Sequence, residues 1–571
     1  MKTSSALLTA LLLLGGCQSF APHEQNETPS TESNAAPEAA KPQAYGSFSA
    51  DTLYALLTAE LAGQRNRFDI ALGNYVQQAN ATGDPGVAER AFRIAEYLGA
   101  DQAALDSALI WSEAAPDSVE AQRAAAIQLA RAERYDESMV YMEKVLQQQG
   151  ETHFDFLALS AAETDPGTRA GLLASFDRLL QKYPNNSQLL FGKAVLLQQD
   201  GKSEEALALL GNNTEVPPLL LRARLLQELD RSEEALPLLR NGIRLHPDDK
   251  RLRLTYARLL VENDRMDEAK TEFASLVQQF PTDDDLRFSL ALVSMEAGAW
   301  NEAQAYLEEL IERGTELDTV YFNLGRVYEE QGAPDNALSA YEKVGPGADY
   351  LPAQLRKTSI LFDAGKDQDA IRQLANARQE QPDFAVQLFL IEAETYSERE
   401  RYADADRVLS KALTQFPDDT SLLYTRAMLA EKNDDLRKLE ADLRRILERE
   451  PDNAMALNAL GYTLTDRTNR HEEARQLIEA AHRLAPDDPA VLDSLGWVNF
   501  HLGNFKDAER YLREAMEKYP DGEIAAHLGE VLWTQGRQRD ARQVWREAFK
   551  ADPDNTILRS TIKRLTGSET P

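Results

Sequence analysis

The chain has 571 residues, 43% of them hydrophobic and 27% charged, which are proportions typical of a folded protein. Asp and Glu total 94 against 62 for Lys and Arg, so the formal net charge is −32 and nucleic acid is disfavoured as a partner. This charge fits either a solvated helical surface or the attraction of basic proteins. The only cysteine, Cys17, excludes an intramolecular disulfide and zinc sites built from several cysteines.

The amino terminus begins with Lys2 and continues with an apolar run from Ala6 to Leu14. A membrane-spanning helix needs about 20 apolar residues, so this run has instead the length of a signal-peptide core. It ends at Leu14-Gly15-Gly16-Cys17, which resembles the lipobox of bacterial lipoproteins. The resemblance implies a signal peptide at residues 1–16, cleaved before Cys17, and lipidation of that cysteine. An ordinary signal peptide with an incidental cysteine is the alternative.

Gln18 stands where many lipoproteins retained in the inner membrane carry Asp. The resemblance therefore implies sorting to the outer membrane, with the chain on its periplasmic face. The following stretch is rich in Glu, Pro, Ala, Thr, Ser, Asn and Gln and has no apolar period. We expect residues 17–47 to comprise the lipidated cysteine and a disordered linker that holds the folded body near the membrane.

The first predicted helix runs from Phe48 to Ala62, where leucines recur at helical spacing. Ser49 or Asp51 is the expected N-cap, because a short oxygen-bearing side chain satisfies the free amides of the first turn. A helix at the free end of the chain either docks into a groove of a partner or caps the domain that follows. The sequence leaves both alternatives open.

Two markers recur with one period along the rest of the chain. Prolines close successive units at intervals of 33 to 35 residues, at Pro382, Pro417, Pro451, Pro486, Pro520 and Pro553. An alanine follows an acidic residue or Asn at Ala206, Ala235, Ala269, Ala303, Ala337, Ala370, Ala405, Ala474, Ala508 and Ala541. Two markers with a shared period indicate a repeat array. One unit, near Leu439, is degenerate, and another, near Asn212, is short.

Each unit is predicted to be two antiparallel helices joined by a short turn and closed by its proline. We therefore predict an all-α solenoid of about fifteen helix pairs over residues 48–554. Successive pairs would wind into a right-handed superhelix whose inner groove is lined by the first helix of each pair. Residues 555–571 are expected to supply a capping helix and tail, because the last unit must cover its open face.

The last three units open with Leu460-Gly461, Leu495-Gly496 and Leu528-Gly529. This pattern, with its period of about 34 residues, resembles the tetratricopeptide repeat. The segments 458–468, 489–497 and 523–533, taken with the lipobox, are similar to proteobacterial outer-membrane lipoproteins of this type. Among these, the chain resembles the adaptors of periplasmic carboxyl-terminal processing proteases. The resemblance implies a scaffold that binds the protease and its substrates, such as peptidoglycan hydrolases, and promotes their proteolysis.

No catalytic, metal or cofactor site stands out in the sequence. The run His471-Glu472-Glu473-Ala474-Arg475 begins like a zinc-protease motif but lacks the second histidine. Gly345-Pro346-Gly347 is interpreted as a turn between repeats and not as a phosphate loop. We therefore expect no enzymatic activity, no cofactor and no small-molecule substrate.

Residues one turn along the first helices of the last three units are predicted to face the inner groove. They are Asn458, Tyr462, Asp493, Trp497, Phe500, His501, Glu530 and Trp533. Aromatic anchors beside carboxylates suit peptide recognition. The alternative is that these aromatic side chains pack between adjacent repeats.

Three functions follow from these observations. The first is the lipid-anchored adaptor, whose partners are a processing protease, its substrates and the membrane. The second is a structural assembly factor for a cell-envelope or secretion machine, without a proteolytic role. The third is an unrecognised enzyme.

Overall fold

The computed structural model describes residues 48–149, 152, 154–161, 164–315 and 317–571. These residues form 31 α-helices and one short 3-10 helix, and no strand occurs among them. The expected signal peptide, the lipidated Cys17 and the linker up to residue 47 lie outside the described residues. No helix in the described ranges is both long enough and apolar enough to cross a membrane.

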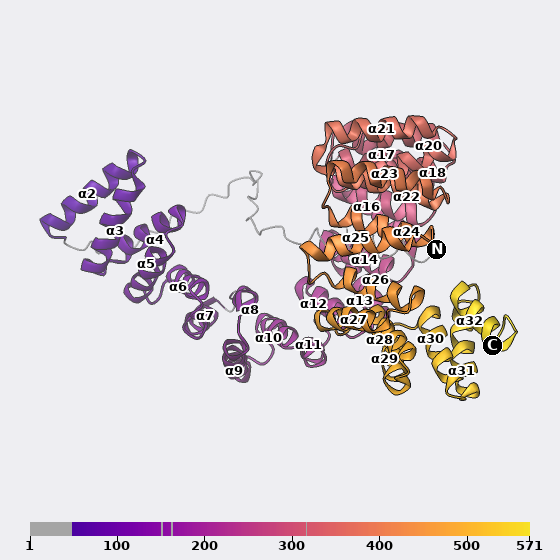
Figure 1. The fold of residues 1–571 in the computed structure, drawn as a ribbon. Helices are drawn as coiled ribbons and strands as arrows, with labels where there is room; N and C mark the ends of the chain where they lie inside the picture. Colours follow the sequence, from indigo (N-terminus) through magenta and orange to yellow (C-terminus); the bar gives the residue numbers. More distant parts are fainter. Residues whose placement is uncertain (1–47, 150–151, 153, 162–163, 316) are drawn as a thin grey trace. The chain divides into compact units, whose positions relative to one another are not determined.

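The chain divides into two compact units between Tyr306 and Leu307, inside α17 (Trp300–Arg313). In the first unit, successive helices run antiparallel in pairs (Figure 1). Its helices are α2 (Ala50–Gln64), α3 (Phe68–Thr82), α4 (Pro85–Leu98), α5 (Asp101–Ala114), α6 (Val119–Arg131), α7 (Tyr135–Gln149), α8 (Phe154–Ala161), α9 (Pro166–Lys182), α10 (Ser187–Gln199), α11 (Ser203–Leu210), α12 (Val216–Glu228), α13 (Ser232–Leu245), α14 (Lys250–Glu262), α15 (Met266–Gln279) and α16 (Asp284–Glu296).

The second unit continues the same alternation and ends with a single unpaired helix (Figure 1). Its helices are α18 (Leu317–Glu330), α19 (Pro334–Tyr341), α20 (Tyr350–Asp363), α21 (Asp367–Glu380), the 3-10 helix η1 (Pro382–Phe384), α22 (Ala385–Glu398), α23 (Tyr402–Gln415), α24 (Thr420–Lys432), α25 (Leu436–Arg449), α26 (Ala454–Arg467), α27 (His471–Leu484), α28 (Pro489–His501), α29 (Phe505–Lys518), α30 (Gly522–Thr534), α31 (Gln538–Ala551) and α32 (Thr556–Thr566).

These elements confirm the predicted all-α repeat fold. Taken two at a time, α2 to α31 make fifteen helix pairs, the number that the period predicts. The first helix is N-capped by Ser49, whose Oγ accepts from the amide of Thr52 at 3.1 Å. The last helix, α32, is N-capped by Asn555 and packs against α30, as expected of a helix that covers the end of an array.

At several repeat boundaries, the residue two positions after the closing proline caps the next helix. Asp488 lies two residues after Pro486, and its carboxylate accepts from the amide of Ala490 at 2.8 Å. Asp419 and Asn453 stand at the same distance after their own prolines and cap α24 and α26 in the same way. At these boundaries the proline ends one helix, and the residue two positions later caps the next. The repeat period therefore follows from the residues of the turn.

The Leu-Gly pairs mark the points where the two helices of a pair approach most closely. A Cβ on Gly496 would lie 2.4 Å from Cγ of Leu512, which comes from the partner helix α29. A Cβ on Gly529 would lie 1.9 Å from Nε1 of Trp545 on α31. Larger side chains of the second helix therefore fill the space that each glycine leaves.

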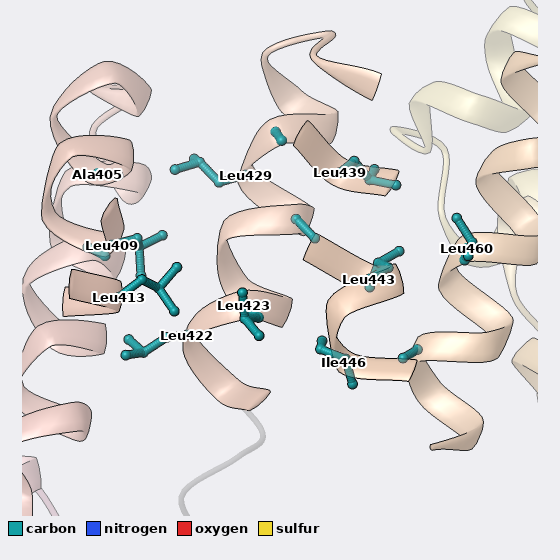
Figure 2. Packing of buried hydrophobic residues seen from close by; sticks show 14 of the residues in the cluster. Ala405, Leu409, Leu413, Leu422, Leu423, Leu429, Leu439, Leu443, Ile446 and Leu460 are labelled. Carbon is teal, nitrogen blue, oxygen red and sulfur yellow. The ribbon is translucent and has the colours of Figure 1, made fainter. Parts of the chain in front are cut away.

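The degenerate unit near Leu439 keeps regular geometry. Leu439 is buried in a hydrophobic cluster that several repeats share, and Figure 2 shows it on α25 beside Leu443. The amide of Leu439 donates to the carbonyl of Asp435, as the amide of Ala474, at the regular alanine position, donates to the carbonyl of Arg470. Leucine replaces alanine there without interrupting the helix. The short unit near Asn212 is confirmed, because α11 has only 8 residues.

Candidate functional site

The first helices of four consecutive repeats in the second unit enclose a groove of about 850 Å³. Its sides come from α24, α26, α28 and α30, and Ile557 of α32 lies at its end. This volume falls in the range of ligand-binding clefts, roughly 300–1,000 Å³. We call this cavity the α24–α30 groove.

Helical spacing places the lining residues on one face of each helix. Tyr424, Met428 and Glu431 on α24 are separated by four and three residues, and Asn458 and Tyr462 on α26 by four. Residues at these separations lie above one another on a helix surface. Other faces of these helices hold leucines and alanines of the buried core.

The lining is acidic. Six carboxylate residues contribute to it, and no Lys, Arg or His does; they are Glu431, Asp466, Asp488, Asp493, Asp521 and Glu523. Apolar side chains complete the surface, among them Met428, Met455, Val491 and Ile524. A partner of this groove therefore meets negative charge and apolar area together.

Tyr462 and Glu523 form a hydrogen bond across the groove wall. The Tyr462 hydroxyl donates to Oε1 of Glu523 at 2.5 Å, joining α26 to α30 past the intervening α28. Burial is the largest cause that raises the pKa of Tyr462, and the carboxylate of Glu523 adds to it. The phenol therefore stays protonated and holds the carboxylate in place at all physiological pH values.

Glu431 has no such partner. Its side chain is half-buried, and no hydrogen bond or ion pair joins it to another described residue. Burial raises its pKa, and the charges of Glu523 and Asp466 raise it further. Arg467 acts in the opposite direction but forms its own ion pair with Asp434. Glu431 is thus a desolvated carboxylate facing an open groove.

Asp493 belongs to both the groove and a buried pair behind it. Nδ1 of His527 lies 2.9 Å and 3.1 Å from the two carboxylate oxygens of Asp493, and both residues are buried. The Trp497 ring stacks on the His527 ring with centroids 4.1 Å apart. Burial, the largest single cause, opposes protonation of His527, but the charge and hydrogen bond of Asp493 together with the charges of Glu523 and Glu530 raise the pKa of the imidazole.

The structure brings three of the eight predicted groove residues to the cavity: Asn458, Tyr462 and Asp493. The other five lie outside its lining. Trp497 is 6% exposed and packs between Phe500, His501 and His527. Phe500 and His501 lie on the same helix as Trp497, α28, and only the contact with His527 on α30 runs to the next repeat.

Glu530 and Trp533 make contacts at the carboxyl-terminal end of the unit. The carboxylate of Glu530 accepts from Arg564 of α32 at 2.8 Å and 2.5 Å. The Trp533 ring lies 5.6 Å from the ring of Trp545, its neighbour on α31. Both residues therefore support the end of the repeat stack and do not line the groove.

Sequence reasoning missed Tyr424, Met428 and Glu431, because it examined only the last three units. The repeat period predicts two of these three residues. Moving Asn458 and Tyr462 back by 34 residues gives Tyr424 and Met428, which occupy the same face one repeat earlier. Glu431 and Asp466, near the ends of their helices, gave no such signal.

The described residues hold no group of three or more His, Cys, Asp or Glu side chains that could bind a metal ion. The partial motif at His471 does not complete a metal site there. His471 instead stacks on His501 with centroids 4.9 Å apart. The groove lining presents carboxylates, hydrogen-bonding groups and apolar side chains.

Comparison with known proteins identifies the repeats. Profiles described as tetratricopeptide repeat match residues 175–208, 226–293, 288–350, 424–489 and 495–556. A protein of Pseudomonas aeruginosa described as TPR repeat-containing is 65% identical over 575 residues, covering 100% of this chain and 98% of its own. The chain belongs to the tetratricopeptide-repeat family. Proteins with this fold are typically scaffolds for protein–protein interaction without catalytic activity.

One further protein and two solved structures are also similar to this chain. The bacteriophage adsorption protein A of Escherichia coli is 35% identical over 88 residues, which are 15% of this chain and 9% of that protein. The crystal structure of yeast Tom70 is 12% identical and covers 90% of this chain and 95% of its own, with a TM-score of 0.34. The Naa15/Naa10 structure with HypK-THB is 15% identical over 90% of this chain and 96% of that one, with a TM-score of 0.35.

Proposed function

We propose that the protein is an outer-membrane-anchored periplasmic adaptor that binds a carboxyl-terminal processing protease and its substrates, such as peptidoglycan hydrolases. The observation that carries the proposal is the α24–α30 groove, which is open, partly apolar and of a size suited to a segment of another protein. The lipobox-like segment ending at Cys17 and the resemblance of the last repeats support the location and the class of partner.

An adaptor needs a second surface, and α2 offers one. Four of its apolar residues are more than half exposed: Leu53 at 53%, Tyr54 at 75%, Leu57 at 55% and Leu61 at 54%. Their spacing along the helix puts them on one side, while Ala59 and Leu56 face the core of the first unit. We propose that this exposed face, the α2 face, docks into an apolar groove of the protease.

Two separate surfaces explain how a protein without catalytic groups would promote proteolysis. A protease held on the α2 face and a substrate held in the α24–α30 groove share one chain. The second encounter then becomes intramolecular and takes place at a high effective concentration. The overall avidity can exceed either single affinity by roughly 10²–10⁴-fold. The acceleration therefore requires both surfaces on the same molecule.

The test combines capture and turnover. Affinity purification of the full-length protein from cell envelopes is expected to recover a processing protease as the main partner. The purified protein is expected to speed degradation of a peptidoglycan hydrolase by that protease. Recovery of components of an envelope machine without a protease, together with unchanged turnover, would establish the structural assembly factor instead.

A matched pair of variants tests the α2 face. Tyr54→Glu with Leu57→Glu places two charges on the proposed docking surface, and capture of the protease should be lost. Val140→Glu on α7 is the control, because Val140 is 56% exposed but lies on another helix. Equal loss of capture in both variants would show that the α2 face is not the docking site.

A further inference from the structure

The α24–α30 groove is lined by acceptors that lack donors. No ion pair joins half-buried Glu431 or exposed Asp466 to another described residue. Oδ1 of Asn458 is buried without a hydrogen-bond donor in the same part of the chain. Other carboxylates of the lining are already engaged. Asp488 and Asp521 cap helices, and Glu523 accepts from Tyr462.

Unpartnered acceptors in a partly desolvated groove favour an occupant rich in donors. Burial and neighbouring negative charge disfavour the ionised form of Glu431, so a cation placed beside it would relieve both effects. Lysine carries three donors and arginine five, and neither carries an acceptor. Acidic segments would add repulsion, because the chain has a formal charge of −32 and the lining holds no Lys or Arg.

The groove also has an apolar component that a simple cation would leave unused. Met428 lies on α24 one turn from Glu431, and Met455 and Ile524 lie on α26 and α30. Methionine side chains adapt to varied apolar shapes, which suits the recognition of more than one sequence. The occupant that satisfies both components carries cationic and apolar side chains within one short stretch.

We propose that the α24–α30 groove selects substrate segments in which Lys or Arg lies next to apolar residues. The cationic head binds between Glu431 and Asp466, beside the Tyr462–Glu523 hydrogen bond, and a neighbouring apolar side chain rests on the methionines. Selectivity comes from charge and not from a fixed sequence, so several basic substrates can share the groove. This inference rests on the proposed adaptor function, because it names the substrates that the adaptor holds.

Direct binding to the full-length protein tests the inference. Fluorescein-labelled peptides with alternating Leu and Arg are compared by anisotropy with peptides in which citrulline replaces Arg at every position. Citrulline keeps the shape and removes the charge. The Arg peptides are expected to bind at least about tenfold more tightly, since one charge-assisted hydrogen bond has that effect. Their affinity should also fall as salt concentration rises.

Substitutions in the protein locate the effect. Glu431→Gln with Asp466→Asn removes two charges from the groove and should abolish the preference for Arg over citrulline. Glu514→Gln with Glu517→Gln is the control, because it removes two charges from α29, outside the lining. Circular dichroism and thermal melting establish that both variants remain folded. The control variant should keep the full preference.

The outcomes separate this inference from the adaptor proposal. Equal binding of Arg and citrulline peptides, or equal loss of preference in both variants, overturns the inference while protease stimulation still decides the adaptor function. Conversely, charge-selective binding that requires Glu431 and Asp466 supports the inference even where the purified protein fails to stimulate the protease. Peptide affinity and protease turnover are therefore measured on the same preparations.

Discussion

His527 and Asp493 form a buried pair directly behind the groove, and their chemistry gives the region a pH dependence. The pKa of His527 is raised in the folded state despite burial, because Asp493, and beyond it Glu523 and Glu530, favour the imidazolium. A group whose folded pKa is raised stabilises the fold fully below its unfolded value, about 6.5, and loses that contribution as pH rises through the folded pKa.

We therefore predict that His527→Phe lowers the free energy of unfolding more at mildly acidic pH than at alkaline pH. Urea denaturation followed by tryptophan fluorescence at the two pH values measures the difference. Trp497 reports on the site, since its ring stacks on the imidazole. A cost of the substitution that is the same at both pH values would show that His527 acts through packing alone.

The raised pKa of Glu431 has the opposite effect on stability to that of His527. A carboxyl group whose folded pKa is raised opposes folding once pH exceeds its unfolded value, about 4.3, and ceases to do so below that value. Glu431→Gln is therefore predicted to raise the midpoint of thermal unfolding at neutral pH and to leave it unchanged near pH 4. Glu517→Gln, on the exposed surface of α29, should change neither midpoint. Stabilisation by a substitution that weakens peptide binding would mark Glu431 as a residue kept for function.

The sequence predicts only some of the individual residues that line the groove. The helical period assigns Asn458, Tyr462 and Asp493 to the groove because it fixes the face of each first helix. It does not reveal how far the next repeat covers that face. Trp497 lies one turn beyond Asp493 on α28, but His527 of the following repeat covers it.

At the scale of helices, close approach within each pair sets what the sequence tolerates. We predict that Gly496→Ala destabilises the second unit by about 1–3 kcal/mol, because its Cβ would overlap Leu512. Gly73→Ala is the opposite case: Gly73 lies inside α3, and an added Cβ would meet nothing within 4 Å. It should stabilise the first unit by about 0.5–1 kcal/mol, as alanine favours helix over glycine.

Thermal and urea unfolding of the two glycine variants measures these effects. Opposite signs are the expected result, and a stabilising Gly496→Ala would contradict the packing described for α28 and α29.

The helices are predicted from the sequence more completely than the groove residues. Their period follows from turn chemistry, in which Pro486 ends one helix and Asp488 begins the next, and such local signals need no knowledge of distant contacts.

At the scale of the whole molecule, the proposed anchor decides where the adaptor works. Cys17→Ser is predicted to abolish lipidation and move the protein from the membrane fraction to the soluble periplasmic fraction. Labelling with a palmitate analogue and fractionation of cell envelopes measure the change. Retention of the label by the variant would favour the ordinary signal peptide with an incidental cysteine. Purified variant protein should still bind protease and substrates.

The hydrogen bond between Tyr462 and Glu523 restricts how this protein can change in evolution. Repeat arrays grow and shrink by duplication or loss of whole units, because each unit contacts only its neighbours. Tyr462 and Glu523 are 61 residues apart and bridge α26 and α30, so a unit gained or lost between them would separate the two side chains. We expect lineages to vary in repeat number before α26, while the block from α26 to α30 is inherited as one piece.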